Sequence, residues 1–128
     1  MNYYFNTTLT MDFDKAIEVA TAALKEEGFG VLTEIDIAQT MKKKLDVDLP
    51  PYKILGACNP QYAYRALQAE NKIGTMLPCN VIVQDIGEGK VEVSAVNPMA
   101  SMQAVQNPEL GVLAEEVTEK LKRMIASL

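Results

Sequence analysis

The sequence has no histidine and only two cysteines among its 128 residues. Any thiol or soft-metal chemistry must therefore use Cys58 and Cys79, and no recognisable catalytic constellation lies elsewhere in the chain. The two cysteines are not spaced as Cys-x-x-Cys, which excludes a zinc ribbon or a thioredoxin-type redox centre. Two thiolates alone do not complete a tetrahedral zinc shell, so we expect no metal site, and the sequence identifies no cofactor.

The sequence also lacks long apolar runs and clusters of positive charge. No stretch approaches the ~20 apolar residues that cross a bilayer, and we expect no signal peptide ahead of the first strand. The net charge of −5, from 17 acidic and 12 basic side chains, argues against a nucleic acid or an anionic membrane as partner. The only basic run, residues 42–44, is typical of a solvated helix face. We therefore expect a cytoplasmic protein, where two cysteines are free thiols, metal ligands or redox centres rather than a structural disulfide.

The chain contains one continuous alternation of strand and helix patterns. Strands are predicted at residues 3–9, 29–35, 52–57, 81–86 and 91–96, and helices at about 12–28, 36–45, 60–70 and 107–128, with a loose helical turn within 99–105. N-caps are predicted at Thr10 or Asp12, at Asp36, at Asn59 and at Asn107. The result is the α/β (α+β) class, with residues 1–128 as a single domain. We expect a mixed five-stranded sheet with packed helices, in the order β-α-β-α-β-α-β-β-α.

Both cysteines lie in Cys-Asn pairs next to a proline, at the ends of predicted strands. Residues 57–60 (Ala-Cys-Asn-Pro) connect the third strand to a helix, and residues 78–81 (Pro-Cys-Asn-Val) lead into the fourth strand. Cys58 therefore lies beside the unpaired backbone N–H groups of a helix N-terminus, where anions are stabilised and reactive thiols occur. Alternatively, Cys58 is a small apolar residue that closes a strand end, as free cysteines commonly are.

The distance between the two thiols depends on how the chain returns to the sheet. A right-handed crossover would make the third and fourth strands parallel and would place the thiols a strand length apart, too far to bond. If residues 72–78 return the chain instead, the strands are antiparallel and the thiols are neighbours. Both alternatives fit the sequence.

Other polar side chains have both a functional and a structural interpretation. Glu34 and Asp36 share one face of an extended segment and form either an acid pair or a solvent-facing strand end with Asp36 as cap. Arg65 either reaches an anion near Cys58 or forms a surface pair with Glu70. Tyrosines at positions 52, 62 and 64 either line a pocket or form the edge of the core.

Three segments resemble motifs of the domain of unknown function 302 family. They are residues 28–36 (Gly-Phe-Gly-Val-Leu-Thr-Glu-Ile-Asp), residues 52–60 with Ala63, Ala66 and Leu67, and residues 77–81 (Leu-Pro-Cys-Asn-Val). The resemblance implies a small α/β domain with a mixed sheet and a tendency to form homodimers, and it implies no reaction, cofactor or catalytic residue. The family pattern carries both Cys-Asn pairs. This chain has Asn97-Pro98 where the family typically has Asp-Pro, which argues against an acid role at position 97.

These observations predict a homodimeric binding module that holds a small anion or metabolite in a polar pocket at the helix start after Cys58. The predicted ligand contacts are Cys58, Asn59 and Asn80, with Glu34 as a further contact. Apolar residues 76–77 and 99–105 form either an interface between copies or part of the core. The alternative function is a thiol-dependent redox enzyme or sensor, with Cys58 as nucleophile and Cys79 as resolving partner. These two cysteines are the only catalytic candidates.

Overall fold

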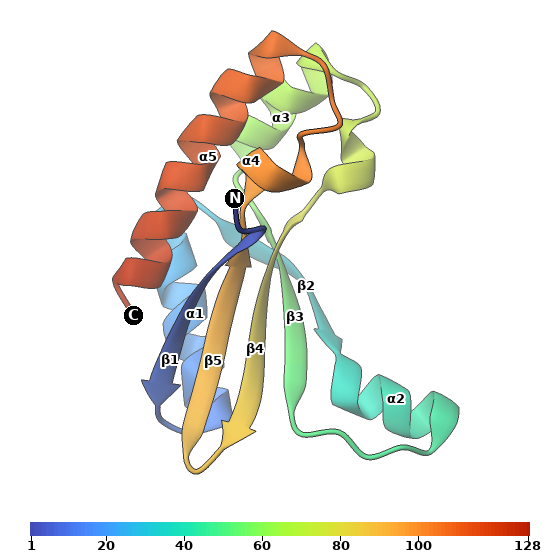
Figure 1. The fold of residues 1–128 in the computed structure, drawn as a ribbon, viewed down its shortest axis with the longest axis vertical. Helices are drawn as coiled ribbons and strands as arrows, with labels where there is room; N and C mark the ends of the chain where they lie inside the picture. Colours follow the sequence, from blue (N-terminus) through green and yellow to red (C-terminus); the bar gives the residue numbers. More distant parts are fainter.

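The computed structural model describes all 128 residues and contains one open sheet of five strands (Figure 1). The strands are β1 (Tyr4–Thr10), β2 (Gly30–Asp36), β3 (Tyr52–Cys58), β4 (Cys79–Gly87) and β5 (Lys90–Val96). They lie in the order β1-β5-β4-β3-β2, and every neighbouring pair is antiparallel. The single five-stranded sheet is confirmed, but it is antiparallel rather than mixed. The reason is that the segment after the third helix returns the chain to the end of the sheet where β3 finishes.

The helices follow the predicted order. They are α1 (Phe13–Glu26), α2 (Ile37–Leu45), α3 (Pro60–Ala69), the 3-10 turn η1 (Ile73–Met76), α4 (Pro98–Ser101) and α5 (Pro108–Ala126). The 3-10 turn η1 is added in one connection, and the loose turn predicted within 99–105 is the short helix α4. The predicted caps at Asp12, Asp36 and Asn107 are confirmed, since each side chain accepts a hydrogen bond from a backbone N–H in the first turn. Gly28, just past α1, has φ of +87°, a conformation that glycine adopts at little cost.

Helices α1 and α5 cover one face of the sheet and enclose the main core (Figure 1). This core is a cluster of 16 buried apolar residues. Val83 and Val93 point into it because alternate side chains of a strand face the same side. They meet Leu24 of α1 and Leu121 of α5, which are completely buried. Complete burial of one such side chain contributes about 1.5–3 kcal/mol.

A second, smaller cluster lies beyond the end of the sheet. It consists of four buried residues, Ala66, Ile73, Leu110 and Leu113, which come from α3, η1 and the first half of α5. Apolar side chains of the connecting segments pack against it, namely Met76, Leu77, Met102 and Val105. The apolar residues at 76–77 and within 99–105 therefore contribute to packing inside the molecule.

Helix α2 and the second face of the sheet have no cover. Figure 1 shows α2 projecting away from the sheet, beside the end of β2. None of its residues is buried, and Leu45 at its end is 66% exposed. Ile37 and Met41 of α2 are half-buried, so the helix packs only loosely against the domain.

Candidate functional site

A cavity lined mainly by apolar side chains lies between the two apolar clusters. It has a volume of about 310 Å³ and is formed by the ends of β3 and β4 together with α3, α4 and α5. Fifteen of its 18 lining residues are hydrophobic, and none carries a charge. Leu32 and Leu67 line the cavity and are also 68% and 43% exposed, so its mouth opens to solvent beside them. The prediction of a polar pocket is therefore wrong, because the walls of this cavity are almost entirely apolar.

Both cysteines line this cavity, as free thiols. The antiparallel register places Cys79, the first residue of β4, directly opposite Ala57 and next to Cys58, the last residue of β3. Of the two arrangements that the sequence left open, the structure has the antiparallel one, which brings Cys58 and Cys79 to the same end of the sheet. The two Cys-Asn pairs thus mark one place in the fold, where a strand leaves the sheet and the next enters it.

The Cys79 thiol is held in its neutral form. Burial in apolar surroundings and, to a smaller extent, the charge of a Cys58 thiolate raise the pKa of Cys79 to about 11. At neutral pH, Cys79 is therefore an apolar wall residue with a weak S–H donor and not a nucleophile.

Asn59 has a different role from the predicted cap. Its side chain makes no capping hydrogen bond with α3. Instead, Nδ2 donates to the carbonyl oxygen of Glu27 at 3.4 Å and lies 3.0 Å from the position that a Cβ on Gly28 would occupy. The amide thus ties the start of α3 to the turn between α1 and β2. It replaces capping with a contact between segments far apart in sequence, which local patterns do not reveal.

The start of α3 retains unpaired backbone donors because Asn59 does not cap it. Pro60 at the first position has no N–H, and the first helical bond is donated by Ala63 to the carbonyl oxygen of Asn59. The N–H groups of Gln61 and Tyr62 have no acceptor within the protein. These donors and the positive end of the helix dipole lie directly after the two cavity-lining residues Cys58 and Asn59.

Two of the predicted ligand contacts lie away from the cavity. Asn80 is adjacent to Val81, which is buried in the core, so the Asn80 side chain points to the uncovered face of the sheet. In the ladder between β3 and β4, Asn80 lies opposite Gly56. Glu34 lies on β2 with its carboxylate 3.6 Å from Nζ of Lys53, in an exposed ion pair. The structure therefore brings together Cys58, Asn59 and Cys79 and separates them from Asn80 and Glu34.

The remaining candidates have mostly structural surroundings. Asp36 caps α2, and Arg65 lies 3.9 Å from Glu116 of α5 rather than pairing with Glu70. Tyr62 lines the cavity, whereas Tyr64 is 64% exposed. No three His, Cys, Asp or Glu side chains are grouped closely enough to hold a metal ion. No helix has the length and apolar character needed to cross a membrane.

One wall of the cavity lies outside the motifs that the sequence revealed. It consists of the α5 side chains Leu110, Leu113, Ala114 and Val117. In the sequence these positions have the helical spacing of ordinary core residues. The only available signal was the number of alanines on the facing sides of α3 and α5, which leaves space between the helices.

The fold and the cavity together define a class, a small antiparallel α/β domain with a ligand-sized apolar cavity at one end of its sheet. The chain belongs to the family described as Domain of unknown function DUF302, whose model matches residues 5–128. The resemblance seen in the three motifs is thereby confirmed. The crystal structure of uncharacterized conserved protein DUF302 from Bacillus stearothermophilus is similar, with 26% sequence identity and a TM-score of 0.88. That match covers 97% of this chain and 96% of the other. None of the curated proteins matches the chain.

Proposed function

We propose that this domain binds a small, mostly apolar molecule with one anionic end in the cavity between its two clusters. The observation that carries this proposal is the cavity itself, about 310 Å³ in volume with 15 hydrophobic residues among 18. Ligand sites are typically concave, mostly apolar and supplied with a few polar groups that orient the ligand. Here those polar groups are the Asn59 amide and the N-terminus of α3.

The volume limits the size of the ligand. An apolar cavity of roughly 150 Å³ holds one benzene molecule, so this cavity suits roughly a dozen non-hydrogen atoms. A medium-chain or aromatic carboxylic acid has this size and shape. A bare inorganic anion would leave most of the apolar wall without contacts and is a poorer fit.

The side chains that line the cavity limit the charge of the ligand. No basic side chain lines the cavity, so a second negative charge would have no counter-charge. One carboxylate is matched by the unpaired N–H groups of Gln61 and Tyr62 and by the helix dipole, a favourable interaction of about 0.3–1 kcal/mol beyond the hydrogen bonds. Hydrophobic burial supplies most of the affinity, and the helix end supplies the preference for an anion.

A thermal-shift comparison of octanoate with 1-octanol tests this proposal. At ten times its dissociation constant, octanoate should stabilise the fold by about 1.4 kcal/mol and raise the melting temperature by a few degrees. Octanol should have a smaller effect, because it lacks the charge. Ala114→Leu fills the cavity and should abolish both effects, whereas Ala22→Leu, an exposed control on α1, should not. Equal stabilisation of both variants, or no stabilisation by either ligand, would overturn the proposal.

The competing function is thiol chemistry at Cys58 with Cys79 as partner. It is favoured by the position of both sulfur atoms on one cavity wall and opposed by the raised pKa of Cys79. Iodoacetamide labelling at several pH values, with Cys58→Ser and Cys79→Ser, separates the two functions. Rapid alkylation of Cys58 at neutral pH would favour thiol chemistry, and thiols that react only after denaturation would exclude it.

We also propose that the domain is a cytoplasmic homodimer. Support for the dimer comes from the end of the projecting helix α2 and the segment after it, where Leu45, Val47 and Leu49 are 66%, 43% and 46% exposed. Apolar side chains at this density are typical of an interface. Sedimentation of the double variant Leu45→Glu/Leu49→Glu beside the unmodified protein tests it. A dimer that becomes monomeric on substitution supports the interface, and an unchanged mass for both proteins excludes it.

A further inference from the structure

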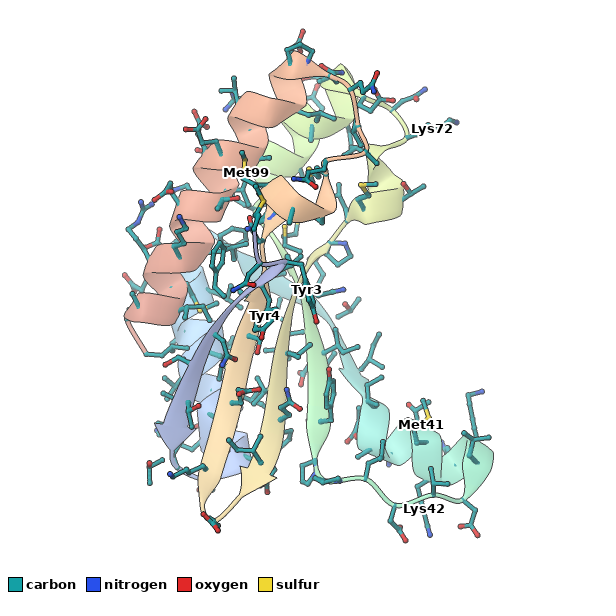
Figure 2. All side chains as sticks on the ribbon, viewed as in Figure 1. Tyr3, Tyr4, Met41, Lys42, Lys72 and Met99 are labelled. Atoms are coloured by element: carbon teal, nitrogen blue, oxygen red, sulfur yellow. The ribbon has the colours of Figure 1, made fainter.

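The uncovered face of the sheet carries a second hollow, of about 420 Å³, which the cavity ligand does not use. Its floor is formed by side chains of β1, β4 and β5 that point away from the helices. Tyr3 and Tyr4 at the N-terminus and Tyr52 on β3 contribute the aromatic part of its lining. Figure 2 shows Tyr3 and Tyr4 lying over this face of the sheet, in front of the strands.

One carboxylate is fixed in this hollow. Glu92 on β5 accepts a hydrogen bond from Nδ2 of Asn6 at Oε2 and another from Nε2 of Gln84 at Oε1, both at 3.2 Å. Asn6 is itself held by Ser94, whose hydroxyl donates to Oδ1 at 2.6 Å. This row across three strands fixes the position of the carboxylate. Because both amide donors are neutral, the negative charge of Glu92 remains uncompensated.

Glu92 has no ion-pair partner within the protein. It is the only charged residue that lines the hollow, and it takes part in none of the ion pairs of the chain. The tyrosine rings are also free of internal cations, since the cation–π contacts of the protein involve Tyr62 and Phe5. Tyr3 and Tyr4 contact each other edge to face, with ring centroids 4.9 Å apart.

We propose that this hollow binds a small alkylated ammonium ion. A carboxylate supplies the counter-charge, and tyrosine faces attract a cation whose methyl groups are easily desolvated; this combination recognises quaternary ammonium compounds. A metal ion is a poorer match, because Glu92 is the only carboxylate and hard cations require several oxygen ligands. An anion is excluded by the charge of Glu92.

Choline is the probe, and 3,3-dimethyl-1-butanol, which replaces its nitrogen by carbon, is the uncharged control. Titration of the isotope-labelled protein at constant ionic strength should shift the side-chain amide resonances of Asn6 and Gln84, with a dissociation constant in roughly the millimolar range. The uncharged analogue should leave them in place. Equal shifts from both compounds, or none from choline, would overturn the proposal. Absence of shifts because a second copy covers the face would overturn it equally.

Four variants assign the effect to the named groups. Glu92→Gln should weaken choline binding about tenfold or more, while Glu18→Gln, which makes the same charge change on exposed α1, should not. Tyr4→Phe keeps the ring face and should bind nearly as well, whereas Tyr4→Leu should bind several-fold more weakly. Unchanged affinity in both Glu92→Gln and Tyr4→Leu would overturn the proposal. If Glu92→Gln fails to fold, the comparison of Tyr4→Phe with Tyr4→Leu still tests the proposal.

Discussion

The two ends of this domain are built from similar residues but packed in different ways. At one end, α1 and the second half of α5 lie on the sheet, and 16 apolar residues form a continuous cluster. At the other end, α3, η1 and the first half of α5 form a cluster of four, with the 310 Å³ cavity between it and the sheet. Apolar walls around an open volume forgo contacts that close packing would supply. The close-packed end therefore provides stability, and the open end keeps the volume that the proposed ligand would occupy.

The largest expected loss of stability comes from truncating one leucine, and comparing one leucine from each end tests this difference in packing. Leu24, completely buried in the larger cluster, should cost about 3–4 kcal/mol of unfolding free energy when changed to alanine. Leu113 lines the cavity and already lacks neighbours on one side, so Leu113→Ala should cost at least about 1 kcal/mol less. Urea unfolding followed by circular dichroism measures both values. Equal costs would show that the two ends are packed alike.

The next test lies at the boundary between the two ends. A Cβ on Gly56 of β3 would collide with Oγ1 of Thr33 and lie 2.8 Å from Cγ of Pro78. Gly56→Ala should therefore destabilise the domain by about 2–3 kcal/mol, since neither neighbour is the far end of a flexible side chain.

The double variant Gly56→Ala/Thr33→Ala checks the cause, because removing the Thr33 hydroxyl should recover part of the loss. A harmless Gly56→Ala substitution would mean that the strands separate easily at this position. Gly30→Ala is the matched control, since a Cβ there meets no atom within 4 Å.

The pH dependence of stability should report the apolar surroundings of Cys79. Its folded-state pKa of about 11 lies above its ordinary value of 9.0, so between these values the unfolded chain releases a proton that the folded chain retains. The contribution of Cys79 is therefore fully present below about pH 9 and is lost as the pH rises to about 11, by roughly 2–3 kcal/mol.

Unfolding of the unmodified protein and of Cys79→Ala between these pH values isolates this effect. The difference between the two proteins removes the contributions of lysine and tyrosine side chains. Parallel curves would indicate that water reaches the thiol.

The sequence revealed the features that neighbouring residues determine and not those that depend on segments far apart in the chain. Local patterns predicted the caps at Asp36 and Asn107 and the long helix that is α5, because neighbouring residues determine these features. Strand direction did not follow from them, since it depends on how a long connection returns the chain. The pleat of β4 then decided that Cys79 faces the cavity while Asn80 faces away from it. The cavity left only a weak signal in the sequence, because a void depends on how two helices face each other and not on either helix alone.

The smallest expected change in stability comes from filling the cavity, and it distinguishes the two ends by sign as well as size. Ala20 is completely buried in the larger cluster, so Ala20→Leu must displace neighbours and should cost about 1–3 kcal/mol or more. Ala114 borders the cavity, where the added carbons enter existing space, so Ala114→Leu should change the unfolding free energy by less than about 1 kcal/mol and could raise it. Chemical denaturation of both variants makes the comparison. If Ala114→Leu destabilises as strongly as Ala20→Leu, the cavity walls are rigidly shaped for something other than a hydrocarbon side chain. If it stabilises while octanoate no longer binds, the domain has given up stability in order to keep this volume open.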